Sequence, residues 1–377
     1  MSLTVLMGCS VDSEPETSEM KTAAVEVVSF VTGYDEAYRT NRVHEANKVN
    51  RAWAIPSGFV AYEGGEQSIG IAFTQNNVDP TIGTGTAESP KPMIGSFFKS
   101  GDKWRTDLEN IDAGTYQLYG YIPHQTAINY SITDYDGANG SYSTGAIMTL
   151  QNVPTVMPND LCVVIGAKHG TDKEHDSGLR QGDFSFTAKQ GTDSKDYVFL
   201  LFDHLYAALR VQMRVQGDYA TRRTIKLKKL RLQASVGNTP TTKKTSITIT
   251  LNKTTDGTNP ITNVTFTPTG TEISDGVIVE SKDGIELTTD FQPFQSHFMP
   301  AGVTKLNLIS TYDVYDRKGN LIRLNDEAIN TIDIQELFSG QTQALRGRRY
   351  TINMTINPTY LYMLSEPDLD NPTVTIN

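Results

Sequence analysis

Apolar and polar positions alternate with a period of two along most of the chain. In residues 209–215 every second residue is apolar: Leu209, Val211, Met213 and Val215. This period is typical of a β-strand with one buried face. Similar apolar or alternating runs predict strands at residues 25–31, 69–73, 116–122, 161–165, 197–202, 224–232, 247–251, 276–279, 306–314 and 350–356.

Turn signals punctuate these runs, and helical signals are weak. Asp256-Gly257, Asp283-Gly284 and Lys318-Gly319-Asn320 predict hairpin turns, and a turn is also expected near Gly217-Asp218. Residues 325–338 suit either a helical turn or a strand, because their isoleucines fit both spacings. The sequence therefore predicts an all-β chain.

Length and composition indicate more than one domain. A chain of 377 residues predicts two or three domains. Residues 233–246 are polar and contain Gly237, Pro240 and two lysines, so we interpret them as an interdomain linker. Two β-sandwich domains are expected, at residues 51–233 and 234–377.

The net charge and the distribution of charged and apolar residues limit the classes of partner that this chain can have. The net charge of -10 predicts no general attraction to nucleic acid. The sequence contains no apolar run of about 18 residues, which a membrane-spanning helix would need. A strand with one solvent-facing side explains the strongest basic cluster, although a ligand site is an alternative. That cluster consists of Arg222, Arg223, Lys226, Lys228, Lys229 and Arg231.

The two cysteines stand in different contexts. Leu6-Met7-Gly8-Cys9 ends a short apolar stretch and resembles a bacterial lipobox, in which the cysteine receives a lipid. The first basic residue is Lys21, after Cys9, so we interpret residues 1–9 as a truncated lipoprotein signal. Residues 10–50 would hold an acidic tether, a first strand and an arginine-bearing loop. Cys162 lies in an apolar run and is expected to be a buried small hydrophobe.

No enzyme motif is present, so we predict no catalytic residues, no cofactor and no metal. The sequence lacks a Gly-x-Ser-x-Gly elbow, a Walker loop, a His-Glu-x-x-His pair and a Cys-x-x-Cys pair. His204 is expected to be a hydrogen-bonded core histidine. A solvated loop explains His169, Asp172, Glu174, His175 and Asp176 more simply than a metal site. Glu366, Asp368, Asp370 and Asn371 resemble a calcium loop that lacks its central glycine and closing glutamate.

Four motifs occur in a characteristic order. Residues 116–123 form an aromatic strand that ends in proline, and Asn159-Asp160-Leu161 precedes an apolar strand. Residues 202–211 read Phe-Asp-His-Leu-Tyr-Ala-Ala-Leu-Arg-Val, and residues 347–354 place a basic glycine turn before an alternating tyrosine strand. Together with the lipobox, these motifs resemble the fimbrillin family, the pilus subunits of Bacteroidetes.

The resemblance implies an all-β fold of two transthyretin-like β-sandwich domains in tandem. It also implies export as a lipoprotein to the outer membrane, with transient membrane attachment through the lipid. A surface protease would then cut after an arginine and release the first strand. A C-terminal strand from a neighbouring subunit would fill the groove, building a cell-surface fimbrium. The implied partners are other fimbrial subunits and a host or bacterial surface receptor.

Specific residues suit this scheme. Residues 23–31 form a credible removable strand, and the polar residues 34–50 follow it. Solvated loop arginines are the alternative to cleavage sites, and an ordinary edge hairpin is the alternative to a donor strand. The expected cleavage sites are Arg39, Arg42 and then Arg51. The expected donor residues are Tyr360, Leu361, Tyr362, Met363 and Leu364, then Thr373, Val374, Thr375 and Ile376, with residues 365–372 as a hinge.

Other function classes stay open at this point. A fimbrial anchor would lack the cut and keep its lipid, whereas a tip subunit would lack the donor strand. A monomeric glycan-binding surface lipoprotein would need exposed aromatic platforms, and the only tryptophans are Trp53 and Trp104. A secreted hydrolase would need paired carboxylates in a cleft.

Overall fold

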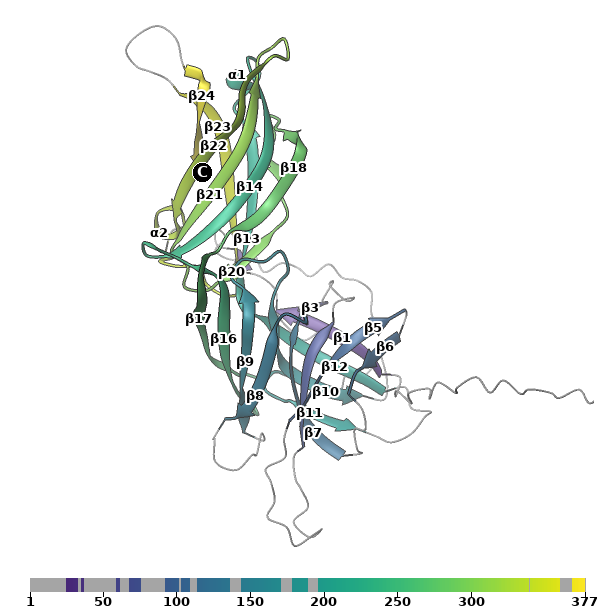
Figure 1. Ribbon diagram of the computed structural model, residues 1–377. Helices are drawn as coiled ribbons and strands as arrows, with labels where there is room; N and C mark the ends of the chain where they lie inside the picture. The colour runs from purple at the N-terminus through teal and green to yellow at the C-terminus, as the bar shows by residue number, and fades with distance from the viewer. Residues whose placement is uncertain are drawn as a thin grey trace, which may run out of the picture.

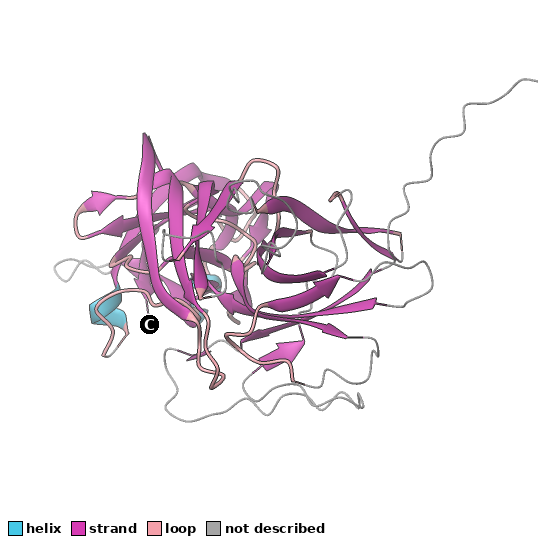
Figure 2. Cartoon of the chain, turned by 90° about the horizontal axis from the view of Figure 1, so that it is seen from below, coloured by secondary structure: helices cyan, strands magenta, loops and turns pink. Residues whose placement is uncertain are grey.

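The computed structural model describes residues 25–32, 35–36, 59–61, 68–75, 92–101, 103–108, 114–135, 144–170, 178–188, 196–338, 340–359 and 368–376. Strands dominate this part of the chain, and its helices are the four-residue α1 (Gly217–Ala220) and α2 (Ile334–Leu337). Figure 1 shows two β-domains stacked end to end, and Figure 2 shows how little of the chain is helical. The all-β, two-domain prediction is confirmed.

The first domain packs a large sheet against a smaller one. The large sheet has the order β3-β1-β12-β10-β7-β4-β5-β6, with β11 on β7, and the smaller has the order β17-β16-β9-β8. Its core extends from Ile69 to Tyr206 and also includes Ile247, Ile249 and Leu251. The strands are β1 (Val25–Thr32), β3 (Phe59–Ala61), β4 (Ile69–Gln75), β5 (Met93–Ser100), β6 (Lys103–Thr106), β7 (Gly114–Ile122), β8 (Asn129–Asp134), β9 (Gly145–Pro154), β10 (Cys162–Gly170), β11 (Ser185–Ala188), β12 (Asp196–His204), β16 (Thr242–Asn252) and β17 (Ile261–Ile273).

The second domain also has two sheets. One has the order β19-β13-β23-β2, with β20 on β13 and β24 on β23, and the other has the order β15-β14-β21-β22, with β18 on β14. Their facing apolar side chains form a separate core that begins at Ala207. The strands are β2 (Asp35–Glu36), β13 (Tyr206–Val215), β14 (Thr224–Val236), β15 (Thr239–Pro240), β18 (Gly276–Glu286), β19 (Gln292–Pro293), β20 (His297–Pro300), β21 (Lys305–Tyr315), β22 (Leu321–Asp333), β23 (Arg348–Thr359) and β24 (Asp368–Ile376).

Residues 233–246, expected as a linker, lie instead in strands. They span the end of β14, the short β15 and the start of β16. β14 pairs with β21 of the second domain, whereas β16 pairs with β9 of the first domain. The chain therefore crosses the junction at β13, returns in the β16–β17 hairpin and crosses again before β18. The polar composition that suggested a linker belongs to the solvent-facing sides of two long strands, so a single cut at 233/234 does not separate the domains.

Three local predictions need adjustment. Asp283-Gly284 lies inside β18, where Gly284 adopts φ 76° beside a register shift against β14, so it forms a bulge and not a hairpin turn. The turn expected near residues 217–218 is the start of α1. Residues 325–338 combine both expected structures, because β22 ends at Asp333 and Asp333 Oδ1 then accepts a hydrogen bond from Gln335 N at 3.0 Å to cap α2.

Among the described helices, neither has the length and apolar character that a membrane span requires.

Candidate functional site: the first strand and the domain junction

The first strand is an inserted member of the large sheet. β1 lies between β3 and β12 and runs parallel to β12, with Val25 opposite Asp196 and Val31 opposite Phe202. β12 is buried throughout residues 197–204, and Val198, Phe199 and Phe202 are 0% exposed. β1 therefore pairs with the outer side of β12, a strand whose side chains are almost entirely apolar and buried.

The segment just after β1 contacts the second domain. β2 pairs in parallel with the start of β23, with Asp35 opposite Arg348 and Glu36 opposite Arg349. β1 and β2 are only two residues apart in the sequence. The N-terminal part of the chain therefore adds backbone pairing to a sheet in each domain.

Asp203, at the end of β12, joins four parts of the chain. Its Oδ1 accepts hydrogen bonds from Thr32 Oγ1 at 2.7 Å and from the His204 backbone N–H at 2.9 Å. Its Oδ2 accepts from Asn259 Nδ2 at 2.7 Å and from Arg346 Nη1 at 2.6 Å. Thr32 ends β1, Asn259 precedes β17, and Arg346 precedes β23 of the second domain. One carboxylate thus links the first strand, the β16–β17 hairpin and the second domain.

The electrostatics of Asp203 favour its charged form. Burial raises the pKa of the carboxyl group, but the Arg346 guanidinium and the hydrogen bonds from Arg346, Thr32 and Asn259 outweigh that effect. The pKa of Asp203 therefore lies below its usual value. Because the Asp203 side chain is only 9% exposed, losing one of these donors would leave a poorly solvated charge.

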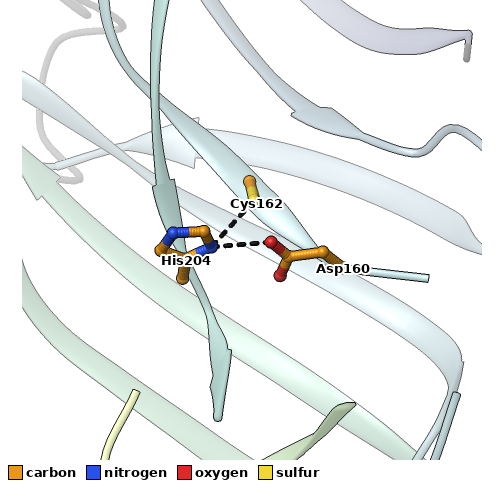
Figure 3. Close-up of side chains that lie close together, drawn as sticks. All are labelled: Asp160, Cys162 and His204. Atoms are coloured by element: carbon orange, nitrogen blue, oxygen red, sulfur yellow. Dashed lines mark hydrogen bonds and ion pairs between the residues drawn. The ribbon is translucent and has the colours of Figure 1, made fainter. Parts of the chain in front are cut away.

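His204 makes a second contact with the end of β1. Its Nε2 lies 2.6 Å from the backbone oxygen of Thr32, and its Nδ1 lies 2.7 Å from Asp160 Oδ2 (Figure 3). A carbonyl oxygen only accepts hydrogen bonds, so Nε2 is the donor to Thr32 O, and Nδ1 faces the Asp160 carboxylate on the other side of the ring. The prediction of a hydrogen-bonded core histidine is confirmed, since His204 is 2% exposed.

Cys162, Asp160 and His204 do not form a nucleophilic relay. Cys162 Sγ lies 3.5 Å from His204 Nδ1, the same ring nitrogen that faces Asp160 (Figure 3). In a working relay the nucleophile and the carboxylate contact opposite nitrogens of the ring. Burial and the neighbouring Asp160 raise the pKa of the Cys162 thiol well above its usual value, which holds it as an unreactive thiol. Cys162 is 0% exposed, as expected of a small residue in a buried strand.

Within the described part of the chain, the same three residues are the group of possible metal ligands that lie close together. Their ligand atoms all lie within 4.8 Å of one another. Tetrahedral zinc bonds of about 2.0–2.3 Å would set neighbouring ligand atoms more than about 3 Å apart. The 2.7 Å between His204 Nδ1 and Asp160 Oδ2 is instead a hydrogen-bond distance. The arrangement is that of a hydrogen-bonded group.

The C-terminal strand pairs with its own chain. β24 runs antiparallel to β23, with Thr373 opposite Asn357 and Ile376 opposite Met354. This is the edge-hairpin arrangement for residues 373–376. The segment expected as a hinge is partly strand, because Asp368 to Pro372 belong to β24. Among the described strands β24 pairs only with β23, and Pro372 lies within it.

Several predicted site residues lie outside the described residues. These are Cys9, Arg39, Arg42, Arg51, Tyr360, Leu361, Tyr362, Met363 and Leu364, together with Asp172, Glu174, His175, Asp176 and Glu366 of the candidate metal loops. His169 lies in β10, where its ring makes an edge contact with Phe186 at 5.7 Å between centroids.

The basic cluster on β14 is a solvent-facing strand side, as predicted. Ile225, Leu227, Leu230 and Leu232 point inward and are at most 1% exposed. Lys229 pairs with Glu280 at 3.1 Å, and Arg231 pairs with both Asp275 at 3.1 Å and Glu327 at 3.0 Å. Acidic groups on β18 and β22 and in the turn before β18 thus neutralise part of its charge. Trp104 is 9% exposed, so it offers no open platform for stacking a sugar.

Sequence reasoning missed the role of Asp203, Asn259 and Arg346. It identified residues 202–211 as a motif but assigned no contact to Asp203. A charged residue beside a histidine at the end of an apolar strand was the available signal, since a buried carboxylate needs donors. Its donors are 56 and 143 positions away for Asn259 and Arg346, so no local pattern could name them.

Comparisons with known proteins give only distant likenesses. No family model and no curated protein matches this chain. Solved structures are similar over nearly its whole length. A fimbrial protein from Bacteroides vulgatus is 14% identical, with 94% of this chain and 98% of that chain covered and a TM-score of 0.34.

Two further likenesses are of the same kind. A proposed cell adhesion protein from Bacteroides fragilis is 8% identical, with 94% and 97% of the two chains covered and a TM-score of 0.40. The fimbrial anchor protein Mfa2 from Porphyromonas gingivalis is 10% identical, with 93% and 97% covered and a TM-score of 0.26. At TM-scores this low, none of the likenesses carries an argument about what this chain does.

Proposed function

We propose that this protein is a non-enzymatic structural subunit of cell-surface fimbriae. It is exported as a lipoprotein acylated at Cys9, cut after Arg39, Arg42 or Arg51, and polymerised when a C-terminal strand of one copy replaces β1 of the next. The observation that carries the proposal is the position of β1, a strand from the N-terminal end of the chain inserted between β3 and β12 of the large sheet.

The energetics of removing β1 favour replacement. β1 pairs with β12 over seven residues, and each lost backbone hydrogen bond matters by about 0.5–1.5 kcal/mol. Because the β12 side chains are apolar and buried, an empty groove would also expose part of the core. A strand added from another molecule restores both the backbone pairing and the burial. A cut at any of the three arginines falls after β2, so the released piece contains both β1 and β2.

The supply of a donor strand is a separate step. β24 is the last strand of the chain and pairs only with β23 among the described strands. Withdrawing it would therefore break one strand pairing and leave the rest of the second domain's sheets connected. The residues of the proposed donor are Tyr360 to Leu364 and Thr373 to Ile376.

Lipidation is a stage of this pathway and not its end. If the cut falls at residue 39, 42 or 51, the mature subunit loses the lipid together with the N-terminal piece. Strand donation would then hold it in the fimbrium, at the surface of the outer membrane. Its partners are other fimbrial subunits and a receptor on a host or bacterial surface.

Treating the purified full chain with an arginine-specific protease tests the proposal. The expected result is a ladder of heat-labile, detergent-resistant oligomers on a gel, which a deletion of residues 373–377 abolishes. A triple Arg39→Gln, Arg42→Gln, Arg51→Gln variant is the control and should stay monomeric. Cut protein that remains monomeric would contradict the proposal.

A second candidate is an anchor or tip subunit. The observation that favours it is β24, which completes its own domain by pairing with β23. A tip subunit would accept a donor strand but not donate one, whereas an anchor would resist the protease. Mixing cut protein with the 373–377 deletion variant separates these roles, because an accepting but non-donating subunit ends the ladder.

A further inference from the structure

The contacts at the end of β1 are more specific than strand pairing requires. Backbone pairing alone accepts almost any side chain, because every residue offers the same N–H and C=O groups. Thr32, however, uses its side-chain hydroxyl on Asp203 Oδ1 and its carbonyl on His204 Nε2. A strand shifted by one residue would turn the side chain at this position to the opposite face and withdraw the hydroxyl.

The same carboxylate also holds the second domain. Arg346 Nη1 donates to Asp203 Oδ2 at 2.6 Å and to the His204 carbonyl at 3.2 Å. The next residue, Gly347, donates its N–H to Tyr206 O at 3.0 Å. Thr32 and the His204 N–H hold Oδ1, so they orient the carboxylate with Oδ2 toward Arg346. The strand that occupies the β1 position therefore affects the orientation of the Asp203 carboxylate and hence its hydrogen bond with Arg346.

We propose that Asp203 and His204 form a register lock for the strand beside β12, which admits a strand with serine or threonine at the position of Thr32 and couples its fit to the Arg346 contact between the domains. In the uncut chain, the coupling between Thr32 and the Asp203–Arg346 contact does not depend on the proposed function. Its extension to an incoming donor strand rests on the proposed function.

The lock explains why two polar residues end an otherwise apolar strand. Asp203 and His204 are 6% and 2% exposed, and each has a polar partner beside it, Arg346 for Asp203 and Asp160 for His204. Leaving a donor or acceptor unsatisfied at such a site is unfavourable, so a strand that lacks the hydroxyl or lies out of register is rejected. Specificity of this kind arises from the penalty on the wrong partner.

Amide hydrogen exchange on the uncut full chain tests the coupling. Thr32→Val should speed exchange in residues 348–353 of β23 on the order of ten-fold, whereas Thr32→Ser should leave it unchanged. In an Arg346→Met background, Thr32→Val should add no further change in β23, because the connecting contact is already absent. Unchanged exchange in Thr32→Val, or an equal increase in the Arg346→Met background, would overturn the coupling.

A second arm tests the register of the donor strand. The C-terminal stretch offers Ser365, Thr373 and Thr375 as residues that could take the place of Thr32. In the protease ladder assay, changing one of these three to valine should abolish the ladder, and the threonine-to-serine or serine-to-threonine change at the same position should keep it. Normal ladders from all three valine variants would overturn the extension to donor strands while the result of the first arm stands. Absence of a ladder from the unmodified chain would instead contradict the proposed function.

Discussion

The hydroxyl of Thr32 donates a hydrogen bond to Asp203 Oδ1 over 2.7 Å, although the two residues are 171 positions apart. Thr32 ends the first strand, and Asp203 is the second-last residue of the strand beside it. The opposite oxygen of the same carboxylate binds Arg346 of the second domain. The end of the first strand and the junction between the domains therefore share one buried charge.

Replacing Asp203 with asparagine should make stability less dependent on pH in the acid range. Because the folded-state pKa of Asp203 lies below its usual 3.8, the folded protein binds fewer protons here than the unfolded chain does in mild acid. The stabilisation is therefore complete above about pH 5 and is lost as the pH falls through the folded-state pKa. Asp203→Asn should melt at a lower temperature than the unmodified chain at neutral pH, with the gap closing toward about pH 3. Melting curves by circular dichroism measure this, and a gap that is constant with pH would argue against a charged Asp203.

Two arginines that each face carboxylates should contribute differently to the stability of the folded chain. Arg346 pairs with Asp203, which is 9% exposed, whereas Arg231 pairs with Asp275 and Glu327, which are 40% and 49% exposed. Arg346→Met should destabilise the chain by about 3 kcal/mol, because it leaves a buried charge without its partner. Arg231→Met should cost less than about 1 kcal/mol, because water solvates its partners. Chemical denaturation of both variants tests the contrast, and equal losses would refute it.

Gly182 should tolerate no side chain. Its φ of +77° disfavours other residues, and a Cβ there would collide with the side chain and backbone N of Thr254. Gly182 also links the loop before β11 to the β16–β17 hairpin, since Thr254 N donates to its oxygen at 3.1 Å. Gly182→Ala should therefore cost about 3 kcal/mol from strain and overpacking.

The matched control is Gly257, which has a similar φ of +78° but open space within 4 Å of the point where a Cβ would lie. Gly257→Ala should destabilise the chain by only about 1 kcal/mol, because the unfavourable positive φ is the only penalty at this position. Thermal unfolding of the two variants separates collision from backbone strain. Similar melting temperatures would show that Thr254 moves aside readily.

The strands themselves were predictable, because their period-two pattern is local. Residues 209–215 and 224–232 lie in β13 and β14. Which strands pair was not predictable, since pairing is decided by contacts between distant residues. Nothing near Val25 indicates a parallel partner at Asp196, and nothing near Thr250 indicates Ile147.

The misread linker and the missed charge network escaped the sequence for two different physical reasons. Residues 233–246 contain buried positions near both ends, such as Ala234 and Thr245, on either side of an exposed run at residues 236–240, and a composition average hides that difference. Asp203 was visible in the sequence, but its energetics depend on Thr32, Asn259 and Arg346, which only the folded chain brings together.

Hydrogen exchange read by mass spectrometry on protease-generated polymer, purified by size, tests the central claim most directly. If a donor strand replaces β1, the polymer should lack the fragment containing residues 25–32, while the amides of β12 remain as protected as in the uncut monomer. A polymer that retains the β1 fragment, or whose β12 amides exchange freely, would contradict strand replacement.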